Sequence, residues 1–156
     1  MAAHPEWTRK LFSDDDFEAI SRAIGDAEAA TTAEIRVHLD RRVPHGPFWT
    51  KGHPMKRARA LFTRLGMHRT RERNGVLIYL AVKDRKLAIV GDDAIHARVG
   101  DTYWEQLRDV MIEDLRGRSP RDGVVRAVQD LGRVLREHFP RRGDKPNELS
   151  NDVDVE

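Results

Sequence analysis

Oxygen-bearing side chains stand at the two ends of a predicted β-hairpin and are the residues of this chain best suited to chemistry. Asn74 precedes a continuous apolar run over residues 76–82, and Asp92 and Asp93 follow a second run over 86–91. Because hairpin strands are antiparallel, these two polar corners must lie side by side at one end of the sheet. Carboxylate, amide and backbone oxygens are the usual protein ligands of calcium and magnesium. The pattern therefore predicts a calcium or magnesium site, unless the polar residues are ordinary turn formers.

A fourth oxygen ligand comes from a strand predicted over residues 34–40. This segment alternates apolar and polar residues, which is typical of a strand with one face in the core. A helix opened by Pro54 separates it from the run at 76–82, and such a strand–helix–strand unit is a right-handed crossover with parallel strands. Glu34 therefore starts at the same edge as Asn74 and joins the predicted metal ligands. The alternative for Glu34 is a solvated strand start.

The sequence lacks the residues and motifs on which many enzymes depend. It contains no cysteine, which excludes disulfides, thiolate nucleophiles and thiolate zinc sites. It has neither a Gly-x-Ser-x-Gly elbow nor a phosphate-binding Gly-x-x-x-x-Gly-Lys loop. Residues 152–154 (Asp-Val-Asp) are similar to an aspartyl nucleophile motif, but no strand is predicted before them. Any hydrolysis would therefore need a metal-bound water.

Basic residues concentrate between residues 41 and 73, a segment that holds ten Lys or Arg and one acid. Four cations share the polar side of its helix and form a candidate anion-binding surface: Lys56, Arg57, Arg59 and Arg64. Nucleic acid, a phosphorylated partner or an acidic lipid surface would be attracted there. The net charge of only +2 and the scarcity of aromatic residues favour instead a solvated face that pairs with the chain's own acidic tail.

The histidines offer a rival site for a transition metal. His45 and His53 lie in the loop that leaves the first strand, at the edge where open α/β sheets usually bind ligands. His38 and Asp84 can approach the same edge. Two loop histidines separated by seven residues are not a specific metal-binding spacing. The alternative is that they lie on the loop without binding a metal.

The elements together predict a small three-layer α/β sandwich, in which about four helices cover a mixed sheet made of a parallel crossover and an antiparallel hairpin. Capping residues or prolines place the helix starts near Ser13, Pro54, Thr102 and Ser119. A short helical turn over 92–99 is expected to end at Gly100. The 156 residues suit a single domain over 1–140, followed by an acidic, flexible tail over 141–156.

Two features of the sequence bear on where the protein resides. No apolar run approaches the length of a membrane-spanning helix, the longest being residues 76–82. The first residues, Met-Ala-Ala-His-Pro-Glu-Trp, lack the basic, apolar and small-residue order of a signal peptide. We therefore expect a cytoplasmic protein.

The hairpin also carries a resemblance to a known family. Its Asn-Gly-Val-Leu start, its charged Asp-Arg-Lys turn and its closing Gly91 resemble the TPM domain, named after thylakoid-lumen, photosystem-repair and receptor-modulator proteins. The flanking sequence agrees in the Thr-Ala-Glu-Ile-Arg-Val segment at 32–37, in the Leu-Phe helix end at 61–62 and in the closing Phe-Pro at 139–140. The similarity covers about residues 13–140.

The resemblance implies a TPM-like α/β domain with calcium as its metal, because that family includes calcium binders with ligands in loops between elements. Asn74 matches the Asp or Asn of the family's Asp/Asn-Gly pair, whereas Asp92 and Asp93 replace its Gly-Tyr-Gly-Leu type of corner and add oxygen donors. We expect a stand-alone cation-binding accessory or interaction module with a protein partner. The alternatives are a weak metal-dependent acid phosphatase, as some family members are described to be, and an anion-binding domain using the basic surface at 41–73.

Overall fold

A mixed sheet lies at the centre of the molecule in the computed structural model, which describes residues 5–45, 52–117, 119–141 and 151–156. Within these residues the sheet contains β1 (Glu34–Asp40), β2 (Gly75–Ala81), β3 (Lys86–Gly91) and β4 (Asp154–Val155). Their spatial order is β3-β2-β1-β4.

The register of the strands confirms the predicted mixed sheet. β1 is parallel to β2, so that Glu34 lies opposite Gly75. β2 and β3 are antiparallel and place Val76 opposite Gly91. The start of β1, the start of β2 and the end of β3 therefore meet at one end of the sheet, as the sequence predicted.

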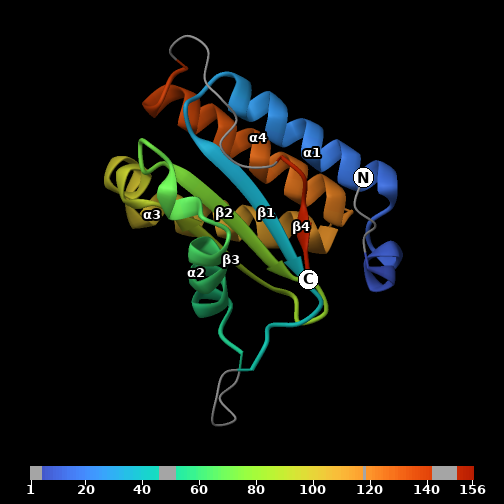
Figure 1. Cartoon of the computed structure of the whole chain (residues 1–156). Helices are drawn as coiled ribbons and strands as arrows, with labels where there is room; N and C mark the ends of the chain where they lie inside the picture. The colour runs from blue at the N-terminus through green and yellow to red at the C-terminus, as the bar shows by residue number, and fades with distance from the viewer. Residues whose placement is uncertain (1–4, 46–51, 118, 142–150) are drawn as a thin grey trace.

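Helices cover the two faces of the sheet unequally (Figure 1). Their bounds are α1 (Asp14–Ala29), α2 (Pro54–Arg64), α3 (Asp93–Gly117) and α4 (Pro120–His138), with short 3-10 helices η1 (Glu6–Lys10) and η3 (Met67–Arg69). Apolar residues of α1, α3 and α4 form the larger core against one face. α2 covers the other face with a smaller core that includes Phe62 and Tyr79. Within the described residues, no helix is both long enough and apolar enough to cross a membrane.

Local sequence signals explain where the helices begin and break. Ser13 caps α1 in a capping box with Asp16, and Ser119 caps α4 by accepting from the backbone N–H of Asp122. The predicted break at Gly100 is confirmed, because this residue has φ 75° and interrupts α3. Glycine tolerates this left-handed conformation, which other residues rarely adopt.

The end of the chain differs from the flexible tail expected over 141–156. Residues 142–150 lie outside the described part of the chain, but Asp154 and Val155 form β4 and extend the sheet beside β1. Val153 is 6% exposed and belongs to the larger core. The last described segment is therefore packed against the domain.

Candidate functional site

The sheet brings three of the four predicted metal ligands to one buried corner. Glu34 pairs with Gly75 across β1 and β2, and the backbone N–H of Asp92 donates to the Gly75 carbonyl oxygen at 2.9 Å. Asn74 immediately precedes β2. Glu34, Asn74 and Asp92 are 0%, 1% and 7% exposed. Strand pairing therefore places these residues at one end of the sheet, although the carboxylates of Glu34, Asp92 and Asp93 do not all lie within 4.8 Å of one another.

The predicted ligands at this corner are not equivalent. The side chain of Asp93 is 92% exposed, so this carboxylate belongs to the rim. Asp92 directly precedes α3, and its Oδ1 accepts from the backbone N–H of Asp93, the first residue of that helix, at 2.8 Å. Asn74 donates from Nδ2 to Thr32 Oγ1 at 3.1 Å, which uses the amide nitrogen and not the oxygen.

Arg73 supplies positive charge at the same corner. Its Nε lies 3.4 Å from Asp92 Oδ2, and its Nη2 lies 3.8 Å from Asp93 Oδ2. Asp92 Oδ2 is nevertheless buried and accepts no hydrogen bond from the described residues. Burying a carboxylate oxygen without a hydrogen bond is unfavourable. A cation with a better geometry than this guanidinium would relieve that cost.

A cleft of about 590 Å³ opens beside the corner, between β3, α2 and α3. Asp92 and Asp93 line it together with Trp104 of α3. Two cations also line it, Arg59 of α2 and Arg108 of α3. The sequence grouped Arg59 with a separate anion-binding surface, whereas the structure places it in the cleft lined by Asp92 and Asp93, two of the four predicted metal ligands.

A buried polar cluster that the sequence did not predict lies at the opposite end of β1. It contains His38, which is 0% exposed. His38 Nδ1 lies 2.6 Å from Asp154 Oδ2 of β4, and Nε2 lies 2.9 Å from Asp40 Oδ1. Ionised carboxylates only accept, so both ring nitrogens donate and His38 is an imidazolium. Burial alone would lower the pKa of His38, but hydrogen bonds to Asp154 and Asp40 raise it above 6.5.

Asp40 is the shared acceptor of this cluster. Arg57 Nε donates to it at 2.9 Å and Tyr79 Oη at 2.7 Å, in addition to His38. Burial would raise the pKa of Asp40, but these three donors hold it well below its usual range. Burial and the neighbouring Asp40 carboxylate raise the pKa of Tyr79, which therefore keeps its proton.

The cluster also contains the one group of three His, Asp or Glu ligands that comes together within the described residues. The ligand atoms of His38, Asp40 and Glu156 lie within 4.8 Å of one another. Guanidinium groups already fill this position, because Arg57 binds both carboxylates and Arg64 binds Glu156. A metal ion would have to displace two arginines, so the geometry favours an ion-pair network here.

Comparison with known proteins agrees with the resemblance seen in the hairpin. The sequence matches the family model of the TPM domain over residues 8–134. The chain belongs to the TPM domain family. No curated protein matches it.

Solved structures share the fold of this TPM domain. The BA42 protein from the psychrophilic bacterium Bizionia argentinensis is 32% identical with a TM-score of 0.83, and the match covers 94% of this chain and 96% of BA42. The N-terminal domain of cg2496 from Corynebacterium glutamicum is 16% identical with a TM-score of 0.59, covering 86% of each chain. The N-terminal domain of a P. gingivalis protein is 20% identical with a TM-score of 0.60, covering 85% of this chain and 83% of that one. The last two likenesses concern the fold alone.

The histidine site predicted for this TPM domain does not form within the described residues. His53 precedes α2, and His45 is exposed. The ring nitrogens of His38 contact Asp40 and Asp154 instead, so the described residues form no shared histidine site.

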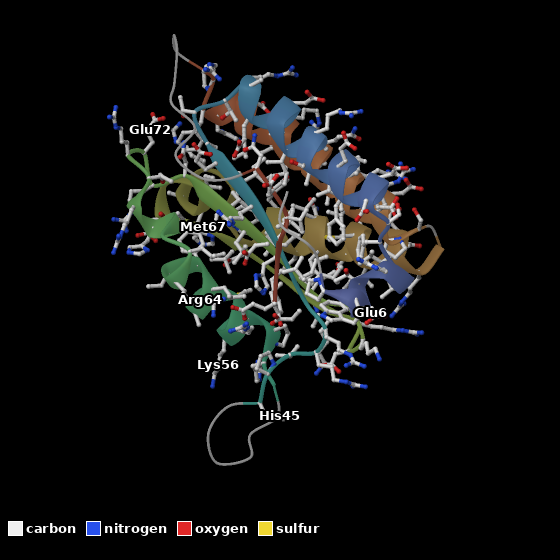
Figure 2. The ribbon with its side chains drawn as sticks, turned by 45° about the vertical axis from the view of Figure 1, so that its right-hand side comes forward. Glu6, His45, Lys56, Arg64, Met67 and Glu72 are labelled. Carbon is white, nitrogen blue, oxygen red and sulfur yellow. The ribbon has the colours of Figure 1, made fainter. Side chains whose placement is uncertain are left out.

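The four cations of the predicted anion-binding surface also lie in different surroundings. Arg57 and Arg64 pair with Glu156, as expected for a basic face that contacts the acidic tail. Arg59 lines the cleft. Lys56 is exposed, and Figure 2 shows it on α2 toward the end of the molecule that carries His45.

Proposed function

We propose that this TPM domain is a divalent-cation-binding accessory module, with calcium as the cation, and that Glu34, Asn74 and Asp92 hold it. The observation that carries the proposal is Asp92 Oδ2, a buried carboxylate oxygen that accepts no hydrogen bond from the described residues. Calcium takes six to eight oxygen ligands and accepts a mixture of carboxylate, amide and backbone groups. The buried corner supplies these chemical types, and the exposed Asp93 adds a carboxylate at the rim.

Arg73 lowers the affinity of the proposed site for a cation, because it competes for Asp92. Its guanidinium is the charge that faces Asp92 Oδ2 without calcium, and it is 56% exposed. An entering cation therefore competes with a side chain that solvent already reaches, and the displaced guanidinium can return to water. Such competition weakens binding, which suits an accessory or regulatory cation.

The first test removes charge and keeps shape. Asp92→Asn with Asp93→Asn keeps the size of both side chains but replaces their carboxylates by neutral amides, and it should abolish calcium-induced shifts in ¹H–¹⁵N NMR spectra. Calcium should also raise the melting temperature of the wild type and not of this variant, because a ligand that binds the folded state stabilises it. Asp109→Asn, at an exposed carboxylate of α3, is the matched control and should leave binding unchanged. A wild type that shows neither effect in millimolar calcium would eliminate the site.

The second test predicts the opposite sign. Arg73→Gln removes the competing charge and should tighten calcium binding severalfold in isothermal titration calorimetry, since Arg73 lies 3.4 Å from Asp92. Arg71→Gln makes the same charge change at an exposed neighbouring position and should have a smaller effect. Equal effects of the two variants would show that Arg73 acts through the general field and not as a competitor.

Weak phosphomonoester hydrolysis is the second candidate function, and the cleft is the observation that favours it. Arg59 and Arg108 provide cations for a phosphate beside Asp92 and Asp93, which supply metal ligands. The described cleft residues include no Ser, Thr or Tyr, so the nucleophile would be a metal-activated water.

We expect turnover of p-nitrophenyl phosphate to stay well below about 10 per second, the median for enzymes, even in millimolar magnesium or calcium. Any activity should disappear in the Asp92/Asp93 variant and fall in Arg59→Gln, while Lys56→Gln on the same helix should retain it. Hydrolysis that survives loss of both aspartates would place the chemistry elsewhere.

A further inference from the structure

The attachment of β4 to the sheet is short. β1 pairs with β2 at all seven of its positions, from Glu34 to Asp40, but with β4 only at His38 and Leu39. The backbone N–H of Glu156 adds one hydrogen bond to the Leu39 carbonyl oxygen at 3.1 Å. Two ladder positions give a modest backbone contribution, so the side chains must select what binds at this edge.

Side chains of the tail alternate between two environments. Val153 and Val155 contact the larger apolar core. Asp154 and Glu156 instead meet cations of β1 and α2 on the other face of the sheet. Backbone pairing combined with separate surroundings for alternate side chains is how exposed sheet edges recognise extended peptides.

Four cationic groups face the acidic positions of the tail. Asp154 contacts His38 at 2.6 Å and Arg36 at 3.7 Å, while Glu156 binds Arg57 and Arg64. These cations come from two elements, β1 and α2, and therefore form a preassembled row beside the sheet edge. The Nε of Arg36 is buried and makes no hydrogen bond with the described residues, so the tail does not use all donors of this row.

We propose that this edge of β1 is a docking site for an extended segment of a partner protein in which aliphatic and acidic residues alternate. The chain's own residues 151–156 occupy the site as an intramolecular ligand. A phosphate or a lipid headgroup would match the cations, but neither supplies backbone groups for Leu39 or aliphatic side chains for the core beside Val153. The complete set of contacts therefore fits a peptide strand.

The docking site is separate from the proposed calcium corner. The corner lies at the start of β1, near Glu34, and the docking site lies at its other end, near Leu39. Figure 2 shows the same separation, with Glu72 just before the corner and Lys56 of α2 toward the opposite end. Because residues 151–156 belong to the same chain as the docking site, a partner strand must outcompete them.

The experiment uses a fluorescent peptide Asn-Asp-Val-Asp-Val-Glu, the sequence of residues 151–156, and two full-length proteins. One is the wild type and the other carries Asp154→Asn with Glu156→Gln, which weakens its own tail. The variant should bind the peptide about tenfold more tightly than the wild type, because its tail competes less. NMR shifts should centre on His38 and Leu39. The control peptide Asn-Asn-Val-Asn-Val-Gln should bind about tenfold more weakly than the acidic one, because it lacks the charges.

Several results would overturn the proposal. Absence of peptide binding to both proteins, or equal binding of the two peptides, removes the docking site. Displacement of the peptide by inorganic phosphate or by anionic vesicles at similar charge concentration would assign the site to small anions or to a membrane. Concentration-dependent dimers of the variant without peptide would assign it to the tail of a second copy. Adding Arg64→Gln to the double variant should weaken peptide binding. If the double variant does not fold, the single variant Glu156→Gln takes its place.

Discussion

Replacing Asp40 with alanine should lower the free energy of unfolding by about 3–5 kcal/mol, because it breaks a buried ion-pair network from its centre. Asp40 accepts from His38, Arg57 and Tyr79, and its side chain is 5% exposed. The substitution leaves the His38 imidazolium with one carboxylate and the Tyr79 hydroxyl without its acceptor. Urea denaturation monitored by circular dichroism measures the loss.

An exposed ion pair provides the matched control for Asp40. Glu18 pairs with Arg22 across one turn of α1 at 3.5 Å, and the two side chains are 58% and 70% exposed. Glu18→Ala should therefore change stability by about 0.5 kcal/mol or less. If Asp40→Ala costs no more than Glu18→Ala, the buried cluster contributes nothing specific to the fold.

Periodicity located the strands of the sheet well. The alternation over 34–40 coincides with β1, and the run over 86–91 coincides with β3. The buried run over 76–82 corresponds to β2, displaced by one residue. These segments were predictable because their apolar patterns are long enough to specify both the element and its buried face. Pairing rules then located the corner of Glu34 without any tertiary information.

The buried cluster was not predictable from the same patterns. His38 occupies a polar position in the alternation of β1, which normally indicates a solvated face. Its two partners, Asp40 and Asp154, lie 2 and 116 residues away in sequence. Burial of this face depends on α2 and β4, and β4 is only two residues long. So short a strand has too little pattern to be recognised before its neighbour is known.

The position of Arg59 in the cleft was not predictable, for a related physical reason. The sequence predicted which residues share a face of α2, but not how the helix crosses the sheet. α2 packs across β3 as well as β2, and this places Arg59 in the cleft with Asp92 while Arg57 reaches Asp40. One helix therefore contributes side chains to both ends of the sheet. Periodicity describes the helix surface, and only packing decides which site each residue enters.

The stability of this TPM domain should fall on both sides of a pH plateau, because His38 and Asp154 bind each other as ions. The pKa of His38 is raised above 6.5 in the folded state, so its contribution is complete below 6.5 and is lost as the pH rises through the folded value. The hydrogen bond from His38 lowers the pKa of Asp154 below 3.8, so its contribution is present above 3.8 and is lost as the pH falls through the folded value. The plateau therefore extends at least from 3.8 to 6.5 for this pair.

The alkaline side is the more diagnostic, because a neutral imidazole cannot donate to both Asp40 and Asp154. One of the two carboxylates then faces a ring nitrogen that carries no proton, while Arg36 remains charged beside Asp154 and Arg57 beside Asp40. Urea unfolding at a series of pH values should show this loss in the wild type and not in His38→Gln. NMR titration of the ring measures the folded pKa directly, and hydrogen exchange at the backbone N–H of Glu156 reports whether β4 detaches in the same range. A His38 ring that titrates at or below 6.5 would show that burial outweighs the two carboxylates and would remove the basis for the alkaline loss.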